Sequence, residues 1–536
     1  MKMVKSLLLG TAAGFVAVAG AQAADMPVKG AAVQYVKICS LYGDGFYYLP
    51  GTDICVKVGG YVRMQTSWAP SGGQTNWSIF GGNLANVSNT RTDGNGDWSI
   101  RARAYISMDT RQQTEYGVLR TYINIGLSGD SPAGAVFSGN RAFVQFAGFT
   151  VGLAQSFYDF YSSPATSFFG PPSSDTGDGG WRVAAYTQNW GNGITSTLSL
   201  EESRRLTVVN TNWASDPFLV ATAPLNSSAV FTGIETRKVN FPDIVSALRI
   251  DQAWGGGQIM FAAHDASPGY YAGPIQSNAN PLNVAPTGTT LANVTGCPFG
   301  TVTGAEVCGH PADKIGWAAG VGGRLNNITP TGSYFQFQVN YTKGAMRYLA
   351  VTPFGAGSGA FFKGATLGYG WATDGVYSNL TGDVRLTTAY GFNAAYDHYW
   401  TKALKTSVYS AAGWVVYDSA ANNAICTLES QFNTAGSLGG PQPGVGAGLQ
   451  IGGQYPGFTN CNNNWKYWVL GSRTQWNITP AFYVGLDVLY TKLLTASSGF
   501  VYYTAAAGNA KPTGYYQLTD QDAWIAQVRF HRDILP

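Results

Sequence analysis

Two arginines, Arg101 and Arg103, stand two positions apart in the stretch DWSIRARAYISMDTR, residues 97–111. Guanidinium groups at this spacing lie on one side of an extended chain, where their permanent positive charge can attract and orient anions. The alternate positions of the stretch carry apolar residues: Trp98, Ile100, Ala102, Ala104, Ile106 and Met108. A strict period of two predicts a β-strand with one apolar and one polar face. At about 3.3 Å per residue, this strand is long enough to cross a bilayer obliquely.

Three further arginines, Arg63, Arg120 and Arg141, occupy the polar side of neighbouring alternating segments. An arginine on the lipid side of a spanning strand costs about 2–4 kcal/mol near the bilayer centre. The opposite parity of arginines and aliphatic residues therefore predicts that all five guanidinium groups line a water-filled interior, on one wall. The alternative is that they are ordinary solvated or salt-bridged surface charges.

The same alternation recurs along the whole chain, in 16 segments. They are residues 54–65, 97–111, 115–128, 141–147, 150–156, 182–189, 194–203, 244–254, 258–265, 314–326, 333–343, 386–400, 404–417, 465–476, 481–494 and 522–532. Short connections near residues 112, 148, 191, 256, 329, 402 and 478 alternate with long ones at 69–96, 129–140, 157–181, 204–243, 266–313, 344–385, 418–464 and 495–520. An even strand number, short turns on one side and long loops on the other are typical of bacterial outer-membrane barrels. The sequence therefore predicts an all-β, antiparallel transmembrane β-barrel of 16 strands.

The composition favours the same class. Charged residues make up 11% of the 536 residues, and 69 residues are glycine, whereas soluble domains average about 25% charged residues. Residues 1–23 have a basic start, an apolar centre and an Ala-Gln-Ala cleavage site, which predicts a secretory signal peptide. Residues 24–52 are expected to lead into a barrel over 53–536. The competing class is a large secreted all-β protein, such as a propeller or a sandwich array, but no blade-like repeat is found.

The charge balance and the cysteines exclude some partners and suggest crosslinks. The chain has 32 basic and 29 acidic residues, so nothing points to nucleic acid as a partner. Six cysteines in an exported chain suggest disulfides, whereas the absence of a CxxC spacing and the scattered histidines give a zinc site little support. No metal or other cofactor is expected. Nearest neighbours are the favoured pairs, because each pair flanks one short segment or loop: Cys39 with Cys55, Cys297 with Cys308, and Cys426 with Cys461.

Catalytic motifs are missing from the chain. No G-x-S-x-G elbow, HExxH helix or P-loop occurs. Asp397 and His398 are adjacent and could act as an acid–base pair, but their position at a predicted short turn brings no nucleophile near them. Structural packing is the favoured interpretation of this pair. A barrel enzyme is therefore the weaker alternative, and no catalytic residue is predicted.

Four stretches carry a family resemblance. They are CSLYGDGFYYLPGTDICVKVGGYVRMQ from Cys39, RAFVQFAGFTVGLAQSFYDFY from Arg141, NAAYDHYWT from Asn393 and GSRTQWNITPAFYVGLDVLYTKL from Gly471. They closely resemble the alphaproteobacterial general porins, the porin-2 family that includes the Brucella and rhizobial outer-membrane porins. The resemblance implies a trimeric, 16-stranded barrel of the Gram-negative outer membrane that passes small hydrophilic solutes by diffusion. Such porins usually end in an aromatic residue that the assembly machinery recognises. This chain ends in Leu535 and Pro536, so we expect the departure to bear on the efficiency of assembly and not on the fold.

The resemblance also implies that the third loop, residues 157–181, folds into the lumen. Its carboxylates Asp159, Asp175 and Asp178 would then oppose the arginines across the narrowest section. Opposed charges of this kind orient dipolar solutes and screen them by size and charge. The partners implied are outer-membrane lipid and lipopolysaccharide, further copies in a homotrimer, and small hydrophilic solutes.

The aromatic residues distinguish two kinds of channel. Six of them stand at or near strand ends, where they are expected to form interfacial girdles: Trp98, Tyr341, Trp400, Trp476, Tyr490 and Trp524. A sugar-selective channel, the main alternative to a general pore, would need a track of aromatic residues inside the lumen. Tyr61, Tyr105 and Tyr122 have the parity for such a track. A non-channel adhesin would conduct no ions.

Overall fold

A computed structural model describes residues 37–68, 98–130, 134–161, 167–168, 180–210, 240–269, 310–349, 357–377, 382–431, 458–503 and 514–534. The chain divides into two compact units, residues 1–57 and 58–536. The signal peptide predicted at 1–23 lies outside the described residues.

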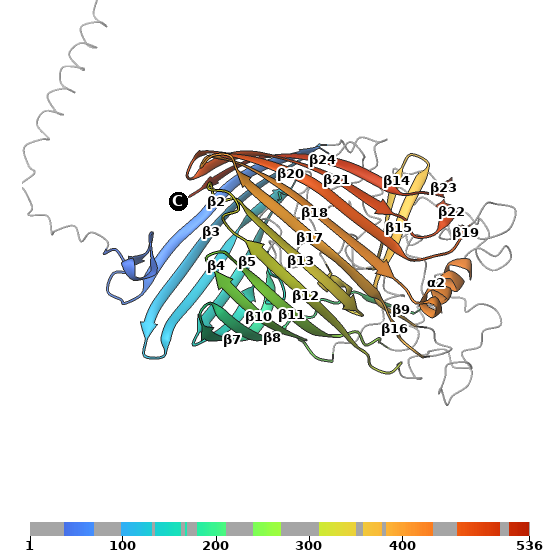
Figure 1. Ribbon diagram of the computed structural model, residues 1–536, viewed down its shortest axis with the longest axis horizontal. Helices are drawn as coiled ribbons and strands as arrows, with labels where there is room; N and C mark the ends of the chain where they lie inside the picture. The colour runs from blue at the N-terminus through green and yellow to red at the C-terminus, as the bar shows by residue number, and fades with distance from the viewer. Residues whose placement is uncertain are drawn as a thin grey trace, which may run out of the picture. The chain divides into compact units, whose positions relative to one another are not determined.

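Sixteen antiparallel strands close into a barrel (Figure 1). In chain order they are β2 (Cys55–Trp68), β3 (Trp98–Thr114), β4 (Gly117–Asp130), β5 (Ala135–Phe146), β6 (Phe149–Ala154), β7 (Trp181–Gly191), β8 (Ile194–Glu201), β10 (Asp243–Gln252), β11 (Gly255–Asp265), β12 (Ile315–Leu325), β13 (Tyr334–Lys343), β17 (Thr388–Tyr399), β18 (Leu404–Val416), β20 (Trp465–Thr479), β21 (Phe482–Leu494) and β24 (Gln521–Asp533). Each strand pairs with the next of this series, and β24 returns to β2, from Tyr61 opposite Asp533 to Trp68 opposite Ala526. The ring therefore has no free edge, and the predicted 16-stranded barrel is confirmed.

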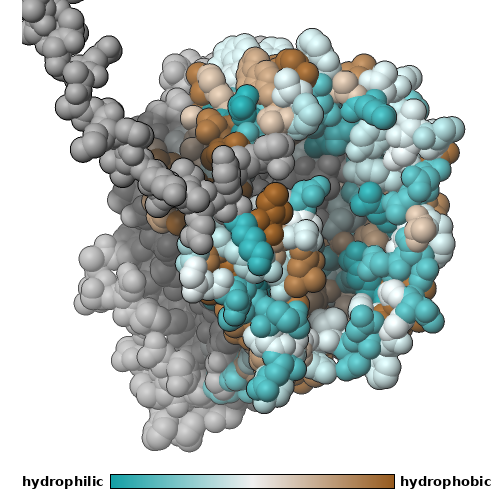
Figure 2. Space-filling view, turned by 90° about the vertical axis from the view of Figure 1, so that its left-hand side faces the viewer, coloured by the Kyte–Doolittle hydropathy of each residue, from teal (hydrophilic) through white to brown (hydrophobic). Residues whose placement is uncertain are grey.

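Side-chain burial alternates along the strands in the direction expected for a membrane barrel. In β3, Ile106 is 58% exposed, whereas Tyr105 and Asp109 are 4% and 9% exposed. Apolar residues thus cover the outside, and polar residues point into the lumen, because every second side chain faces the opposite side of a sheet. Figure 2 views the end of the molecule at which the short turns lie, where the described residues are mainly hydrophilic with hydrophobic ones interspersed.

Two predicted connections differ from the structure, one in position and one in length. The glycines at 255–257 were expected to form a turn, but β10 ends at Gln252 and β11 already begins at Gly255. Gly255 has a φ of +152°, and a Cβ atom there would lie 1.9 Å from the carbonyl oxygen of Arg324, so glycine is needed for the close approach of β12. The long connection predicted at 129–140 is short, because β5 begins at Ala135. A register shift opposite Asn124 and Ile125 breaks the alternation there, which hid the start of β5.

A second sheet forms within the long loops, where no strand was predicted. We call this seven-stranded sheet the lid sheet; its strands are β9 (Thr207–Asn210), β14 (Gly357–Lys363), β15 (Thr366–Tyr377), β16 (Arg385–Leu386), β19 (Phe458–Asn460), β22 (Ser498–Tyr503) and β23 (Gly514–Leu518). In Figure 1 its strands lie at the long-loop end of the barrel, near the helix α2 (Ser419–Gln431). Among the described residues, no helix is long and apolar enough to cross a membrane.

Strand β15 is the central strand of the lid sheet. Its side chains after Thr366 are all buried, so it shows no alternation that sequence reasoning could detect. The carbonyl oxygen of Trp371 accepts hydrogen bonds from the indole N–H of Trp465 at 2.7 Å and from the hydroxyl of Tyr417 at 2.6 Å. These bonds fasten the lid sheet to the ends of β18 and β20.

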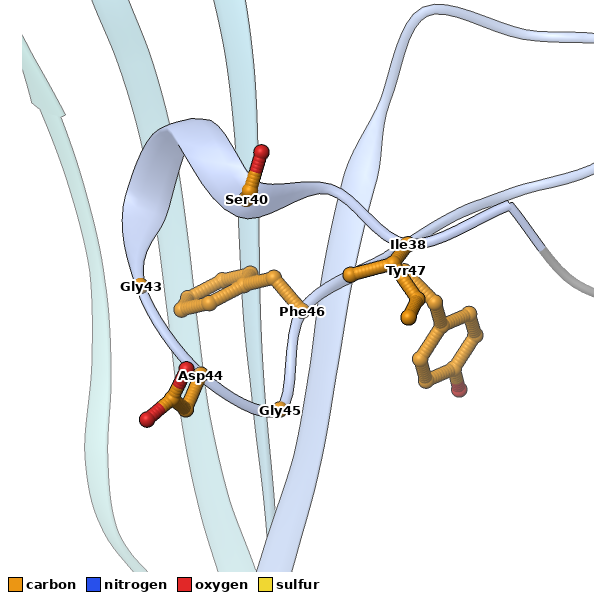
Figure 3. A pocket seen from close by; sticks show the side chains of 7 residues that line it. All are labelled: Ile38, Ser40, Gly43, Asp44, Gly45, Phe46 and Tyr47. Carbon is orange, nitrogen blue, oxygen red and sulfur yellow. The ribbon is translucent and has the colours of Figure 1, made fainter.

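The N-terminal unit is a small disulfide-linked fold. Cys39 and Cys55 form a disulfide around a short 3-10 helix (Ser40–Tyr42) and the strand β1 (Tyr47–Tyr48). A pocket opens beside this helix, lined by Ile38, Ser40, Gly43, Asp44, Gly45, Phe46 and Tyr47 (Figure 3). The Phe46 ring lies inside the loop, and it is buried there with the disulfide. The pocket combines an apolar floor with one carboxylate, that of Asp44.

Candidate functional site

The predicted arginines lie on adjacent strands and on the lumen side. Arg63 of β2 and Arg101 of β3 are buried, at 8% and 7% exposure, while the residues flanking them, such as Val62 and Ile100, are exposed on the outer face. Arg103 donates to the Ser128 hydroxyl across the β3–β4 pair at 2.9 Å. These arginines therefore face the lumen from adjacent strands of the barrel.

Arg120 of β4 is held by a carboxylate that the prediction had not used. Its Nε and Nη2 donate to the two oxygens of Asp109 at 3.0 and 2.9 Å, and its Nη1 donates to Gln145 at 2.9 Å. Arg111 also contacts Asp109, at 3.0 Å. Part of the positive charge of this wall is thus neutralised near the short-turn end. Arg141 of β5 donates to the backbone carbonyl of Asn140.

The third loop enters the lumen, as the family resemblance implied. The backbone N–H of Phe160 donates to the side chain of Gln338 in β13 at 3.0 Å. The hydroxyl of Tyr161 donates to Asn393 in β17. These partners lie far around the ring from β6, where the loop begins, so the described part of the loop crosses the interior.

Residues 167 and 168 of the loop are fixed to the barrel wall at β21. The backbone N–H of Phe168 and the hydroxyl of Ser167 donate to the same oxygen of Asp487 in β21, at 2.6 and 2.9 Å. Two arginines flank the Phe168 ring: the guanidinium carbon of Arg529 lies 4.0 Å from the ring centroid, and that of Arg473 lies 5.4 Å from it. Arg529 also donates to the carbonyl oxygen of Phe168 at 3.2 Å. Arg473 and Arg529 are lumen-facing residues that sequence reasoning missed.

Of the three acidic residues predicted in the loop, Asp159 lies within the described residues. Asp159 is buried and forms a two-bond ion pair with Arg204, with distances of 3.2 and 3.0 Å. Its charge is therefore compensated beside the base of the loop. Asp175 and Asp178 lie outside the described residues, as do Cys297 and Cys308. The disulfide Cys426–Cys461 is present, so two of the three predicted pairs are confirmed.

A buried polar junction connects the loops to the barrel. His264 of β11 contacts Asp243 through Nδ1 at 2.8 Å and Asp374 of β15 through Nε2 at 3.3 Å. Because both ring nitrogens face carboxylate oxygens, the imidazolium form satisfies both contacts. Asp374 also accepts the backbone N–H groups of Leu206 and Met346, at 2.5 and 3.0 Å. One carboxylate thus ties the fourth loop, the sixth loop and β11 together.

A tyrosine completes the junction. Tyr348 lies in a 3-10 helix (Met346–Tyr348) of the sixth loop, and its hydroxyl donates to Asp243 at 2.7 Å. Burial raises the pKa of the Tyr348 hydroxyl well above its ordinary value. Burial likewise raises the pKa of Tyr158 in the third loop, so both hydroxyls stay protonated.

The adjacent pair Asp397 and His398 is divided between the two faces of β17. Asp397 is buried in the lumen, where it accepts from Ser407 and lies 3.6 Å from Arg473. His398 contacts Trp400 and the hydroxyl of Tyr396, residues of the same parity on the other face. The two side chains therefore do not act as an acid–base pair.

The comparisons with known proteins agree with this architecture. A family model described as the porin subfamily matches residues 25–526. The chain belongs to the porin subfamily. The porin Omp2b of Brucella melitensis is 30% identical over 273 residues, which are 47% of this chain and 63% of the relative. Omp2b of Brucella suis matches with the same identity and coverage. The alignment thus spans less than two thirds of these relatives.

One solved structure shares the fold of this porin. The outer membrane channel DcaP of Acinetobacter baumannii superposes with a TM-score of 0.53 at 11% identity, covering 91% of this chain and 99% of that chain. At this identity the likeness shows the fold alone. The family membership identifies this β-barrel as one of the Gram-negative outer membrane.

Proposed function

We propose that this porin forms a water-filled channel for the passive diffusion of small hydrophilic solutes and ions. The observation that carries the proposal is the closed ring of strands with polar side chains inside and a loop anchored across its lumen. Within hydrocarbon, a closed barrel pairs every backbone N–H and C=O group, so its outer face can be apolar while its interior stays aqueous. The matched Brucella relatives are named porins, which supports the same function.

We also propose that the channel prefers anions. The arginines predicted to line the pore, Arg63, Arg101, Arg103, Arg120 and Arg141, lie on the contiguous strands β2 to β5. Of these, Arg120 is paired with Asp109, so it contributes less to the positive field of this wall. Because Asp159 is paired with Arg204, its negative charge does little to cancel the positive charge of these arginines. Fixed positive charge in a narrow aqueous passage favours anions over cations.

The assembly and export of the protein are further parts of the proposal. Residues 1–23 act as a signal peptide, the mature chain forms a homotrimer, and its apolar belt contacts outer-membrane lipid and lipopolysaccharide. Exposed outer aromatics such as Trp400, Trp476 and Trp524 support the lipid contact, because indole rings favour the membrane interface.

Single-channel recording of the refolded, full-length protein tests the function. We expect stepwise conductance in planar bilayers and, in a salt gradient, a reversal potential of the sign for anion preference. No conductance would contradict the channel, and a reversal potential of the opposite sign would contradict the anion preference. An ester or lipid hydrolysis assay on the same preparation tests the enzymatic alternative.

A sugar-selective channel is the second candidate. Tyr61, Tyr105 and Tyr122 lie on the lumen side, as such a channel would require, but their rings stack on neighbouring rings. A saturating reduction of ion current by one sugar would favour this candidate over a general pore.

A further inference from the structure

Five aromatic rings form a continuous stack on the lumen side of the barrel, which we call the ring row. It begins at Phe168 of the third loop and crosses β21, β24, β2 and β3 through Tyr483, His531, Tyr61 and Tyr105. The successive ring centroids are 6.3, 4.7, 4.9 and 5.5 Å apart, with interplanar angles of 18, 16, 28 and 18°. The neighbouring rings of His531 and Tyr61 come from the last and the first strand of the barrel. They meet because β24 pairs with β2, so the closure of the barrel creates the row.

The faces of the three inner rings of the row are occupied. Tyr483, His531 and Tyr61 each have a ring neighbour on both sides. Phe168 at one end has Tyr483 on one side and the guanidinium group of Arg529 close to its ring. Tyr61 and Tyr483 are only partly buried. Because their faces are covered, the parts of these rings that meet the lumen are their edges and hydroxyl groups.

Guanidinium groups stand along the ring row. The guanidinium carbon of Arg63 lies 5.0 Å from the centroid of Tyr61, and Arg529 and Arg473 flank Phe168. A guanidinium group carries a permanent positive charge, so these arginines place fixed positive charge beside the rings. The row therefore presents positively polarised ring edges between fixed positive charges.

We propose that the ring row is a binding subsite for aromatic carboxylates; this inference rests on the proposed channel function. The faces of an aromatic solute carry a negative quadrupole, which is attracted to the positive edges of the row in an edge-to-face contact. Its carboxylate is attracted by the fixed positive charge of Arg63 and Arg529 beside the row. Sugars stack on ring faces, and these are occupied here, so the row does not provide a sugar track.

Two anions of similar size and equal charge separate this subsite from simple charge attraction. Sodium benzoate and sodium cyclohexanecarboxylate are added to the full-length channel in planar bilayers held in potassium chloride. We expect benzoate to reduce the ion current in a saturable way, at a half-blocking concentration about fivefold below that of cyclohexanecarboxylate, as expected for one aromatic contact. Equal half-blocking concentrations, or no saturation, would overturn the subsite.

Variants assign the effect to the ring row. Tyr61→Leu and Tyr483→Leu interrupt the row at two places without changing charge, and each should raise the half-blocking concentration of benzoate about fivefold while the salt reversal potential stays constant. The control is Tyr490→Leu, which removes a tyrosine that stacks with Trp524 on the outer face; it should leave blocking unchanged. Benzoate blocking that is unaffected by both lumen variants would refute the proposal. A wild-type protein without conductance would instead contradict the proposed function, and with it this inference.

Discussion

Asp487 of β21 holds Phe168 of the third loop: its Oδ2 accepts the backbone N–H of Phe168 at 2.6 Å. The same oxygen accepts the Ser167 hydroxyl, and the other oxygen accepts the hydroxyl of Tyr409 at 2.5 Å. The carboxylate is buried, and its loss would leave several donors unpaired at once. Asp487 is therefore a main anchor of this part of the third loop, beside the bond from Arg529 to the carbonyl oxygen of Phe168.

Replacing Asp487 should widen the channel. In Asp487→Ala residues 167 and 168 lose their bonds to β21, and we expect single-channel conductance to rise about 1.5- to 3-fold, because a loop segment released inside the lumen obstructs ion flow less. Asp251→Ala, which removes a carboxylate that is exposed and paired with Arg249, serves as the control and should conduct like the wild type. An Asp487→Ala channel of unchanged conductance, with heat-stable barrel mobility on gels, would show that residues 167 and 168 are held by other contacts.

Replacing Arg101 and Arg103 with neutral residues should reduce the anion preference of the channel. In Arg101→Gln/Arg103→Gln two guanidinium charges leave the lumen wall, and the permeability ratio of anions to cations should fall about twofold or more. The measurement is the reversal potential in a potassium chloride gradient. Arg182→Gln is the matched control, since this arginine is 73% exposed and pairs with Glu202. A reversal potential that is the same in the double variant and in the wild type would place the selectivity elsewhere, for instance at Arg473 and Arg529.

The barrel could be predicted from the sequence because the membrane imposes a simple pattern. Lipid on one side and water on the other require alternation, and β3, with Arg101 buried and Ile100 exposed, shows it in full. The same rule would have found Arg529, which stands between Val528 and Phe530 in a predicted strand. The site prediction missed it because it considered only the arginines of the first strands.

The lid sheet and the loop anchors could not be predicted in this way. Strand β15 is buried on both faces, so residues such as Tyr369 and Trp371 show no period of two. The contact between Phe168 and Asp487 joins residues 319 positions apart, and neither side chain alone indicates a partner. Nor could the sequence reveal that Asp159 would pair with Arg204, because both lie in segments without regular secondary structure.

Disulfide mapping should identify the crosslinks of the intact protein. Under non-reducing conditions we expect peptides containing Cys39 with Cys55 and Cys426 with Cys461, whose sulfurs are bonded in the structure. We also expect Cys297 with Cys308, a pair outside the described residues. A peptide that joins Cys39 to Cys297 would contradict the nearest-neighbour pattern. A reduced and alkylated sample, in which these linked peptides must disappear, is the control.

Removing one partner of the buried ion pair between Asp159 and Arg204 should destabilise the fold, whereas replacing both partners with apolar residues should not. In Arg204→Met the carboxylate of Asp159 stays buried without its partner, so the free energy of unfolding should fall by about 3–5 kcal/mol. The double variant Asp159→Leu/Arg204→Met removes both charges and should recover most of this loss, because an apolar pair of similar volume costs no desolvation. Urea unfolding in detergent micelles, followed by tryptophan fluorescence, measures both. The exposed pair Arg182–Glu202 supplies the comparison, where Arg182→Met should change the free energy by less than about 1 kcal/mol. A double variant as unstable as Arg204→Met would mean that the charged groups make contacts in the junction that apolar side chains cannot replace.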